Sequence, residues 1–284
     1  MEIINRRARM ASLTRKLRRE NKTVGFVPTM GALHEGHLAL VREARQMCDV
    51  VIVSIFVNPA QFNEQTDFDK YPRDLTSDAS LLSEYRVDYV FAPDAGEIYA
   101  ENFSTYVYVE NLTETLEGAV RLGHFRGVAT VVTILFNTIR PDFAFFGQKD
   151  AQQVAVIKRL TKDLGFDTEI VVAPVVREES GLALSSRNAR LSPEERMAAA
   201  VIYKALRAAK IAAKEGERNA ARIVEIIQTT IGGEPLAQID YIGVVDNETL
   251  APVERIGEDA VLIAVAVRFG DTRLIDNTVI NKRL

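Results

Sequence analysis

The sequence predicts an α/β protein in which a doubly wound parallel sheet is followed by a smaller α+β domain. Short apolar runs with strand character alternate with helical patterns through the first part of the chain, as they do in parallel α/β proteins. After Pro174 the sequence changes to a loop rich in arginine and serine, and then to an alanine-rich helical pattern. We therefore predict a first domain over residues 1–174 and a second over residues 175–284.

The first domain is expected to begin with an amphipathic helix, in which Leu13 and Leu17 supply the apolar stripe. Strands are then predicted at residues 23–28, 50–57, 88–91, 143–146 and 169–172. Helices are predicted at residues 38–47, 74–85, 128–139 and 150–164. Parallel sheets of this kind bind ligands at the carboxyl ends of their strands, so the segments that follow the strands are expected to carry the chemistry.

A helix that starts near Ser192 opens the regular part of the second domain. Ser192 is followed by a proline and two glutamates, which together form a strong helix start signal. A second helix is predicted at residues 220–231, just before two glycines, and strands are predicted at residues 239–245 and 260–267. These elements together predict a small α+β domain.

Length, charge and cysteine content narrow the class of protein. With 284 residues, of which 47% are hydrophobic, the chain is long enough for two domains with proper cores. A formal net charge of −4 argues against a general nucleic-acid or membrane-surface binder, and the apolar runs are too short to span a membrane. The single cysteine, Cys48, excludes an intrachain disulfide and is expected to be a buried filler. With no visible secretory leader, we expect a cytoplasmic protein.

The three histidines lie in two glycine-containing segments, residues 29–37 and 118–127, and this concentration indicates one site. The first segment carries His34 and His37 in an HxGH pattern between a predicted strand and a predicted helix, and the second carries His124. Free N–H groups and the positive end of the helix dipole converge at such a turn. The turn after the first strand therefore predicts a phosphate-binding site.

Two alternatives remain for the HxGH turn. Histidines three residues apart can reach one ligand, so zinc binding is one alternative. A zinc site usually needs a third or fourth ligand, however, and only His124 and the single cysteine remain as candidates. The second alternative is that His34 and His37 only cap and pack the turn. We favour phosphate contacts, because Gly31 and Gly36 permit close approach to the backbone.

Two further segments have the residue types that bind a polyphosphate. Residues 147–150 (Gly-Gln-Lys-Asp) follow a predicted strand and open a helix, so Lys149 can reach an anion that the helix start attracts. Residues 184–188 (Leu-Ser-Ser-Arg-Asn) combine two hydroxyls with a guanidinium, which suits directional hydrogen bonds to phosphate. The alternatives are a surface lysine beside a capping aspartate, and a plain polar loop between domains.

Neutral amides offer a way to bind a small polar substrate. Asn58, Gln61 and Gln153 could orient such a substrate without a charge clash, although each could instead hold backbone. Tyr71 and Arg73 lie in a charged loop and are candidates for holding it over the site. The sequence lacks a dinucleotide-binding glycine fingerprint, a nucleophile elbow and a convincing metal cluster. What remains is a set of residues suited to stabilising phosphate charge.

Taken together, these motifs resemble the pantothenate synthetase family, whose members join pantoate to β-alanine at the expense of ATP. The resemblance covers most of the chain and rests on the order and spacing of the motifs. They are residues 28–37 (PTMGALHEGH), Asn58-Pro59 with Gln61-Phe62, Tyr71-Pro72-Arg73, Gly123-His124-Phe125 with Gly127-Val128, Phe146-Gly147 with Lys149-Asp150 and Gln152-Gln153, and residues 185–188 (SSRN). The sequence departs from the family pattern at Leu122, where proline is common, and at Thr66, where an acidic residue is common.

The resemblance implies a nucleotidyltransferase with a HIGH-type signature, in which a Rossmann-like domain holds ATP and pantoate and a smaller domain closes over it as a lid. It implies His37 as the proton donor, with His34 and Lys149 opposing charge on the phosphoryl group, and Gln61 and Gln153 as pantoate contacts beside Asn58. The ATP-binding residues that it implies are Met30, Gly31, Ala32, Leu33, His34, Glu35, Gly36, His37, Gly147, Gln148, Lys149, Asp150, Val176, Leu184, Ser185, Ser186 and Arg187.

The implied reaction has two steps. The pantoate carboxylate attacks the α-phosphate of ATP and releases pyrophosphate, and the amine of β-alanine then attacks pantoyl adenylate and releases AMP. The family acts with Mg²⁺, for which Asp78 is a candidate contact, although the triphosphate is expected to supply most of the ligands. The family is typically dimeric, so we expect a homodimer that binds small molecules and neither nucleic acid nor membrane.

Two rival functions remain open. A nucleotidyltransferase that transfers AMP to a phosphorylated acceptor would release only pyrophosphate, and its acceptor would need more cationic side chains than the neutral Gln61 and Gln153. A catalytically idle nucleotide-binding regulator would bind nucleotide without turnover on pantoate. Release of AMP in the presence of β-alanine separates the ligase from both.

Overall fold

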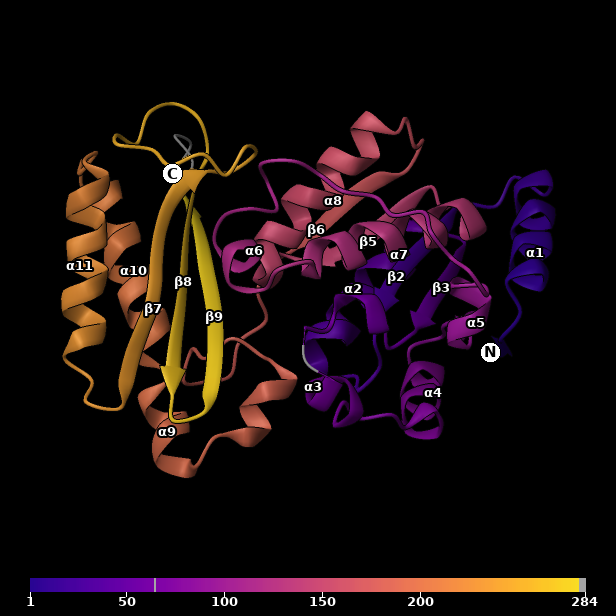
Figure 1. Ribbon diagram of the computed structural model, residues 1–284, viewed down its shortest axis with the longest axis horizontal. Helices are drawn as coiled ribbons and strands as arrows, with labels where there is room; N and C mark the ends of the chain where they lie inside the picture. The colour runs from indigo at the N-terminus through magenta and orange to yellow at the C-terminus, as the bar shows by residue number, and fades with distance from the viewer. Residues whose placement is uncertain (64, 281–284) are drawn as a thin grey trace. The chain divides into compact units, whose positions relative to one another are not determined.

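The computed structural model describes residues 1–63 and 65–280, and the contacts within the chain divide it into two compact units (Figure 1). Unit 1 comprises Met1–Gly147 and Val156–Pro174, and unit 2 comprises Gln148–Ala155 and Val175–Leu284. The short segment Gln148–Ala155 therefore belongs to unit 2, although the chain on both sides of it belongs to unit 1. The assignment of substrate binding to one domain and of a lid to the other stays a prediction.

The described part of unit 1 contains a six-stranded parallel sheet in the order β1-β4-β3-β2-β5-β6. Its strands are β1 (Glu2–Ile4), β2 (Val24–Thr29), β3 (Val50–Ile55), β4 (Tyr89–Phe91), β5 (Phe143–Gly147) and β6 (Glu169–Ala173). The predicted parallel α/β class is confirmed, and the predicted strands differ only by one or two residues at their ends. β1 was not predicted, because three residues are too few to form an alternating pattern.

Helices cover both faces of this sheet. The helical elements of unit 1 are α1 (Arg7–Arg19), α2 (Glu35–Met47), η1 (Pro59–Gln61), α3 (Gln65–Asp69), α4 (Leu75–Glu84), α5 (Ala95–Ile98), α6 (Glu117–Val120), α7 (His124–Ile139) and the part of α8 (Ala151–Asp163) from residue 156 onward. η2 (Gln148–Asp150) and the first residues of α8 belong to unit 2. Consecutive strand residues point to opposite faces. Val27 packs with Leu38 of α2 and Leu82 of α4, whereas Phe26 meets Phe136 of α7 with ring centroids 6.3 Å apart. The sheet is therefore doubly wound, as predicted.

The strand order reverses beside β2, whose neighbours are β3 on one side and β5 on the other. Open parallel sheets bind ligands outside the carboxyl ends of the strands at such a switch point. β2 ends at Thr29, directly before the HxGH turn, and β5 ends at Gly147. The fold therefore places the HxGH turn where a ligand site of unit 1 is expected.

The described part of unit 2 contains a three-stranded antiparallel sheet in the order β7-β8-β9. Its strands are β7 (Ala237–Asp246), β8 (Val261–Phe269) and β9 (Thr272–Ile280), and its helices are η3 (Ser186–Arg190), α9 (Pro193–Ala198), α10 (Val201–Lys214) and α11 (Ala220–Gly232). Figure 1 shows α10 and α11 along the sheet, and Ile263 of β8 shares a core with Ile223 and Ile227 of α11. The predicted smaller α+β architecture is confirmed.

Three local features compare directly with the sequence analysis. The predicted helix start at Ser192 is confirmed, because Ser192 and Glu195 form a reciprocal capping box. α7 begins at His124 rather than at the predicted residue 128, so this histidine lies in a helix. β9 was missed, because polar residues such as Asp276 and Asn277 interrupt its apolar pattern.

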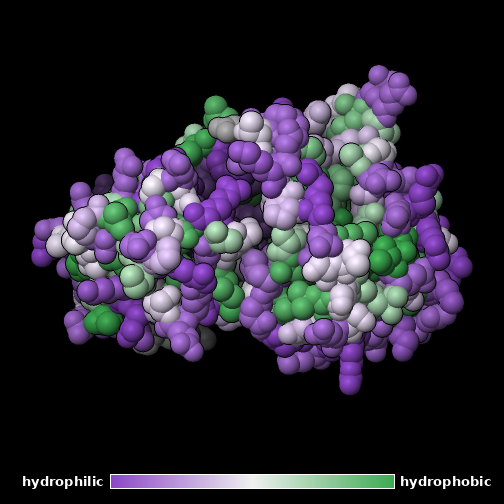
Figure 2. Space-filling model, turned by 90° about the horizontal axis from the view of Figure 1, so that it is seen from below, coloured by the Kyte–Doolittle hydropathy of each residue, from purple (hydrophilic) through white to green (hydrophobic). Residues whose placement is uncertain are grey.

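The surface carries many hydrophilic residues, and the helices of the described residues are too short or too polar to cross a membrane. On the face shown in Figure 2, hydrophilic residues cover much of the surface and hydrophobic residues lie among them. Across residues 1–63 and 65–280, none of the helices combines the length and the hydrophobicity that a bilayer crossing requires.

Cys48 follows α2 and is only 6% exposed. Desolvation in the surrounding core raises the pKa of its thiol to about 11. The thiolate, not the thiol, is the nucleophile. Burial and a raised pKa therefore confirm the expectation that Cys48 is a buried filler.

The packing of Phe26 predicts a large loss of stability when its ring is removed. Phe26→Ala empties a fully buried position in β2, so we expect the free energy of unfolding to fall by about 3–5 kcal/mol. Chemical denaturation followed by circular dichroism measures this change. Leu122→Ala, at a side chain that is 77% exposed, is the control and should change the free energy by less than about 0.5 kcal/mol. Equal changes in the two variants would contradict the central position of Phe26.

Candidate functional site

The turn that follows β2 takes a left-handed backbone at two successive residues. Gly31 has a φ of +83° and Ala32 a φ of +52°, and residues with a side chain adopt this region only at a cost. A Cβ at Gly31 would lie 2.8 Å from Oδ2 of Asp78, so space as well as backbone requires glycine there. The turn is therefore a constrained structure that needs a partner to hold it.

Asp78 in α4 is that partner. Its Oδ2 accepts the N–H of Ala32 at 3.0 Å, and its Oδ1 accepts the N–H of Leu33 at 2.9 Å. The side chain is buried, and these two bonds compensate part of the cost of burying its charge. Successive N–H groups in a turn of this kind form a concavity that binds anions. In this protein the carboxylate of Asp78 fills it.

His34 and His37 orient each other at the start of α2. Nδ1 of His34 accepts the N–H of Gly36 at 3.1 Å, and Nδ1 of His37 accepts the N–H of His34 at 3.3 Å. The two ring centroids are 4.2 Å apart. A ring nitrogen that accepts from a backbone N–H carries no proton, so a neutral ring in this arrangement carries its proton on Nε2. The turn thereby assigns Nε2–H as the donor of each imidazole.

The structure corrects one expectation for this turn, which was that its backbone N–H groups are free to bind phosphate. Side chains accept the N–H groups of Gly31, Ala32, Leu33, His34 and Gly36, and the N–H of His37 donates to the carbonyl oxygen of His34. The side-chain acceptors are the Thr29 hydroxyl, the Asp78 carboxylate and the two imidazole rings. Capping, which was the alternative to function, is therefore real, and it orients the rings that could serve a ligand.

Asn58, Gln61 and His124 come together around η1 in unit 1. Nδ2 of Asn58 donates to Oε1 of Gln61 at 3.0 Å, and Nε2 of Gln61 donates to Sδ of Met30 at 3.0 Å. His124 is buried, and its Nδ1 lies 2.8 Å from the carbonyl oxygen of Gln61. The structure thus connects two predicted amides and the third histidine to Met30 in the turn after β2.

The loop residues Tyr71 and Arg73 have different roles. The hydroxyl of Tyr71 lies 3.5 Å from the carbonyl oxygen of Gly31, a long contact that reaches the HxGH segment. Arg73 donates to the carbonyl oxygen of Phe68 at 2.8 Å, and its guanidinium lies 4.6 Å from the centre of the Phe68 ring. Arg73 therefore holds the loop itself.

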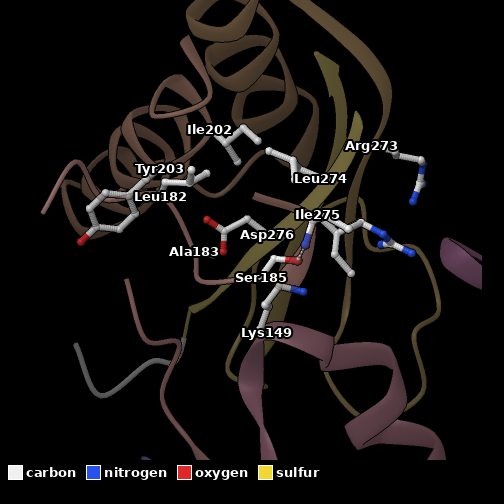
Figure 3. Close-up of a pocket in the computed structure, with 11 residues that line it drawn as sticks. Lys149, Leu182, Ala183, Ser185, Ile202, Tyr203, Arg273, Leu274, Ile275 and Asp276 are labelled. Carbon is white, nitrogen blue, oxygen red and sulfur yellow. Dashed lines mark hydrogen bonds between the residues drawn. The ribbon is translucent and has the colours of Figure 1, made fainter. Parts of the chain in front are cut away.

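A pocket in unit 2 gathers Lys149, Ser185 and Arg187 (Figure 3). The Ser185 hydroxyl caps η3 by accepting the N–H of Arg187 at 3.2 Å. Arg273 of β9 also lines the pocket. This arginine was not predicted as a site residue, because β9 itself was not predicted. Three cationic side chains in one wall favour negative charge nearby, although the cavity between them is only about the size of a water molecule.

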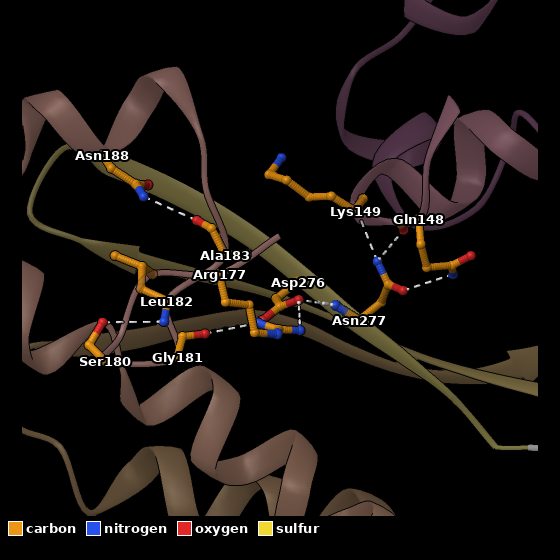
Figure 4. A network of polar contacts seen from close by, with 10 residues as sticks. All are labelled: Gln148, Lys149, Arg177, Ser180, Gly181, Leu182, Ala183, Asn188, Asp276 and Asn277. Carbon is orange, nitrogen blue, oxygen red and sulfur yellow. Dashed lines mark hydrogen bonds and ion pairs between the residues drawn. The ribbon is translucent and has the colours of Figure 1, made fainter. Parts of the chain in front are cut away.

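Asn277 of β9 fixes the turn that carries Lys149 (Figure 4). Its Nδ2 donates to the carbonyl oxygens of Gln148 and Lys149, each at 2.9 Å, and its Oδ1 accepts from Nε2 of Gln148 at 3.0 Å. Both polar atoms of the Asn277 side chain therefore bond to this turn. No local pattern in the sequence indicated these bonds.

Asp276, the preceding residue of β9, holds the loop that carries Val176 and Leu184. Its carboxylate accepts from both terminal nitrogens of Arg177, at 2.6 and 3.0 Å (Figure 4). The Arg177 guanidinium also lies 4.1 Å from the centre of the Tyr203 ring. The N–H of Leu184 donates to the carbonyl oxygen of Val176 at 2.9 Å, which closes the loop. The charge of Asp276 in the pocket wall is thereby paired.

The remaining predicted residues are distributed between the two units. Gln153 lies in α8 within unit 2, whereas Gln61 belongs to unit 1, so their joint contact with one substrate stays a prediction. Asp150 forms an ion pair with Lys149 at 3.5 Å. Glu35 pairs with Arg42 in α2 and thus has a role within that helix. Ser186 is the first residue of η3.

Among residues 1–63 and 65–280, the side chains do not form a magnesium site by themselves. Within the part of the chain that the structure describes, no three His, Cys, Asp or Glu side chains are grouped so that they could hold a metal ion. Asp78, the predicted contact for Mg²⁺, directs its two oxygens to the N–H groups of Ala32 and Leu33. A protein-built Mg²⁺ site would need several oxygen ligands. The carboxylate of Asp78, used on two backbone N–H groups, does not fit such a site.

The sequence matches one family over nearly its whole length. The sequence profile of the family described as pantoate–β-alanine ligase matches residues 2–279. A curated relative, the pantothenate synthetase of Heliobacterium modesticaldum, is 55% identical over 280 residues, which cover 99% of this chain and 99% of the relative.

Solved structures of members of the same family also match this chain. The pantothenate synthetase of Thermus thermophilus matches with a TM-score of 0.90 and 46% identity, over 98% of this chain and 99% of that one. The pantoate–β-alanine ligase of Francisella tularensis, solved in complex with β-γ ATP and β-alanine, matches with a TM-score of 0.80 and 36% identity, over 98% and 97% of the two chains. This chain therefore belongs to the pantoate–β-alanine ligase family.

Proposed function

We propose that this ligase condenses (R)-pantoate with β-alanine to give pantothenate, a precursor of coenzyme A, through a pantoyl-adenylate intermediate. A carboxylate oxygen of pantoate bonds to the α-phosphorus of ATP, and the bond to pyrophosphate breaks. The amine of β-alanine then bonds to the acyl carbon, loses a proton and displaces AMP. Adenylation supplies the leaving group that a free carboxylate lacks, so positioning and charge stabilisation carry the catalysis.

The observation that carries this proposal is the orientation of His34 and His37. Each ring uses Nδ1 to accept a backbone N–H of its own turn, so Nε2–H is the donor of a neutral ring. Such donors at a helix start can stabilise negative charge that develops on a phosphoryl group. We assign His37 as the proton donor and His34 as its partner in charge stabilisation.

Lys149, Ser185 and Arg187 are proposed to bind the phosphates of ATP. They line one pocket of unit 2, where a point charge, a hydroxyl and a planar guanidinium are available to phosphate oxygens. Lys149 is assigned to the charge of the phosphoryl group, and Ser185 and Arg187, with Ser186, to the departing pyrophosphate. Gln61 and Gln153 are assigned to pantoate.

Three further assignments complete the proposal. Mg²⁺ enters with ATP, because phosphate oxygens are the ligands that the ion prefers. The active form is a homodimer, as is typical of the family. The reaction takes place in the cytoplasm, where ATP is abundant.

The experiment that tests the reaction measures AMP release with ATP, pantoate and β-alanine, and with each of the three left out in turn. We expect AMP only when all three are present. Release of pyrophosphate without AMP would indicate a nucleotidyltransferase that stops after AMP transfer. Nucleotide binding without turnover would indicate a regulator. Either result would contradict the proposed ligase.

The orientation of His37 predicts a large loss of activity without loss of the fold. His37→Ala removes both the proton donor and the ring that accepts the N–H of His34, so we expect kcat for AMP release to fall by about 10²–10⁴-fold. Steady-state kinetics and circular dichroism measure activity and fold. Normal turnover in a folded variant would remove His37 from the catalytic set.

The pocket of unit 2 predicts a comparable loss for Lys149. We expect Lys149→Ala to lower kcat/KM for ATP by about 10²–10³-fold, as removal of one charge-stabilising donor does in other enzymes. Lys158→Ala is the matched control, because Lys158 is an exposed lysine in α8, and its kinetics should equal those of the wild type. Similar kinetics in the two variants would contradict the assignment of Lys149.

The bonds of Asp78 predict that a neutral isostere displaces the histidines. Asp78→Asn places an amide N–H₂ against one of two backbone N–H donors, so we expect a loss of about 1–3 kcal/mol in stability and a fall of at least about tenfold in kcat/KM for ATP. Thermal unfolding and steady-state kinetics measure the two effects.

The control for this variant lies on the same helix. Asp74 caps α4 by accepting the N–H of Ser77 at 2.9 Å. Asp74→Ala should therefore cost about 1 kcal/mol of stability without changing the kinetics. If both variants lost stability and neither lost activity, Asp78 would be a structural residue only.

A further inference from the structure

Gln61, the proposed pantoate contact, belongs to a buried network of amides. Asn58 is 1% exposed and Gln61 is 9% exposed. Asn58 uses both ends of its amide, since its Oδ1 accepts the N–H of Ala60 at 3.2 Å and its Nδ2 donates to the carbonyl oxygen of Gly127 at 3.1 Å. A backbone N–H can only donate and a backbone carbonyl can only accept. The backbone therefore fixes which end of the Asn58 amide is oxygen and which is nitrogen.

The orientation of Asn58 fixes that of Gln61. Nδ2 of Asn58 donates to Oε1 of Gln61 at 3.0 Å, so the carbonyl end of the Gln61 amide must face Asn58. Nε2 of Gln61 then lies at the other end, where it contacts Sδ of Met30 at 3.0 Å. A thioether is a weak acceptor, which an oxygen of a ligand can replace at a gain in hydrogen-bond strength. Nε2 of Gln61 is therefore oriented to donate a hydrogen bond to a ligand oxygen.

Tyr99 supplies the remaining bond of this network. Its hydroxyl donates to Oδ1 of Asn58 at 2.6 Å, and its ring packs edge-on against Phe103 with centroids 5.0 Å apart. Burial of the phenol raises its pKa, so the hydroxyl stays protonated and remains a donor. Tyr99 has no bond to Gln61 in this network, so its influence on Gln61 passes through Asn58.

The main chain of Gln61 is fixed as well. η1 approaches α7 so closely that a Cβ at Gly127 would lie 2.3 Å from the carbonyl oxygen of Ala60, which excludes any side chain there. Nδ1 of His124 lies 2.8 Å from the carbonyl oxygen of Gln61. With its backbone held against α7, the amide of Gln61 takes its direction from Asn58, and Tyr99 adds a second hydrogen bond to the Asn58 oxygen.

We propose that Tyr99 is a positioning residue for the acid substrate, and that it acts through Asn58 to present Gln61 as a hydrogen-bond donor. Gln61 then selects an oxygen that accepts, such as a carboxylate or hydroxyl oxygen, and disfavours a ligand group that can only donate. This inference rests on the proposed function, which names pantoate as the ligand of Gln61.

The test compares the steady-state kinetics of Tyr99→Phe with those of the wild type. The variant keeps the packed ring and loses only the hydroxyl, so we expect the KM for pantoate to rise about three- to tenfold. The KM for ATP should stay within about twofold. Met30 is the one residue of this network that is assigned to ATP, and the Tyr99 hydroxyl bonds to Asn58 and not to Met30. Tyr108→Phe is the matched control, since its hydroxyl donates to Glu114 at the surface at 2.8 Å, and its kinetics should not change.

A second variant tests the direction of the Gln61 amide. Asn58→Asp keeps the acceptor for Ala60 and Tyr99 but replaces the donor to Gln61 with an acceptor, which favours a reversed Gln61 amide. We expect the KM for pantoate to rise by more than about tenfold, and by more than in Tyr99→Phe. Circular dichroism and the KM for ATP verify that the fold is intact.

The outcomes separate this inference from the proposed function. A wild-type protein that releases no AMP from pantoate would overturn the proposed function and, with it, the ligand of Gln61. Turnover by the wild type with an unchanged pantoate KM in Tyr99→Phe would overturn only the role of Tyr99. Equal increases in the KM for ATP and for pantoate would also overturn it, because they would indicate a general structural effect.

Discussion

The histidine turn depends on one buried interaction, in which the carboxylate of Asp78 accepts two successive N–H groups from a left-handed turn. In many nucleotide-binding proteins such N–H groups bind the phosphate itself. Here the carboxylate of Asp78 occupies the N–H groups of Ala32 and Leu33, so these two groups are not available to a ligand. The contacts proposed for phosphate are accordingly side chains, namely the two histidines, Lys149 and Arg187.

Buried polar side chains also orient other residues of the candidate sites. Asn277 directs the backbone of the lysine turn, Asp276 pairs with Arg177 beneath the adjacent loop, and Asn58 orients Gln61. Each partner is itself at least nine-tenths buried, so its own bonds are costly to break. Buried polar residues therefore orient the groups that are proposed to contact a substrate. Such fixed orientation suits a reaction that relies on positioning.

The sequence predicted what depends on neighbouring residues. The alternation of strands and helices, the capping box at Ser192 and the segments that carry His37, Lys149 and Arg187 are all encoded within a few residues. It did not predict the roles of Tyr99 and Asn277, because their partners lie 41 and 129 residues away and no local pattern announces them. The expectation of free N–H groups at the HxGH turn was wrong partly for the same reason, since Asp78, which accepts two of them, comes from another helix. The other acceptors, the Thr29 hydroxyl and the two imidazoles, are local.

The dependence of the lysine turn on β9 also orders events in time. Asn277 follows Gln148 by 129 residues, so a ribosome makes the lysine turn long before it makes the residue that fixes it. Domains form progressively from the amino-terminal side as a chain is synthesised. A nascent chain can therefore complete its parallel sheet while Lys149 still lacks its anchor. The lysine turn of unit 2 therefore takes its final, hydrogen-bonded form only after β9 has been made and has folded.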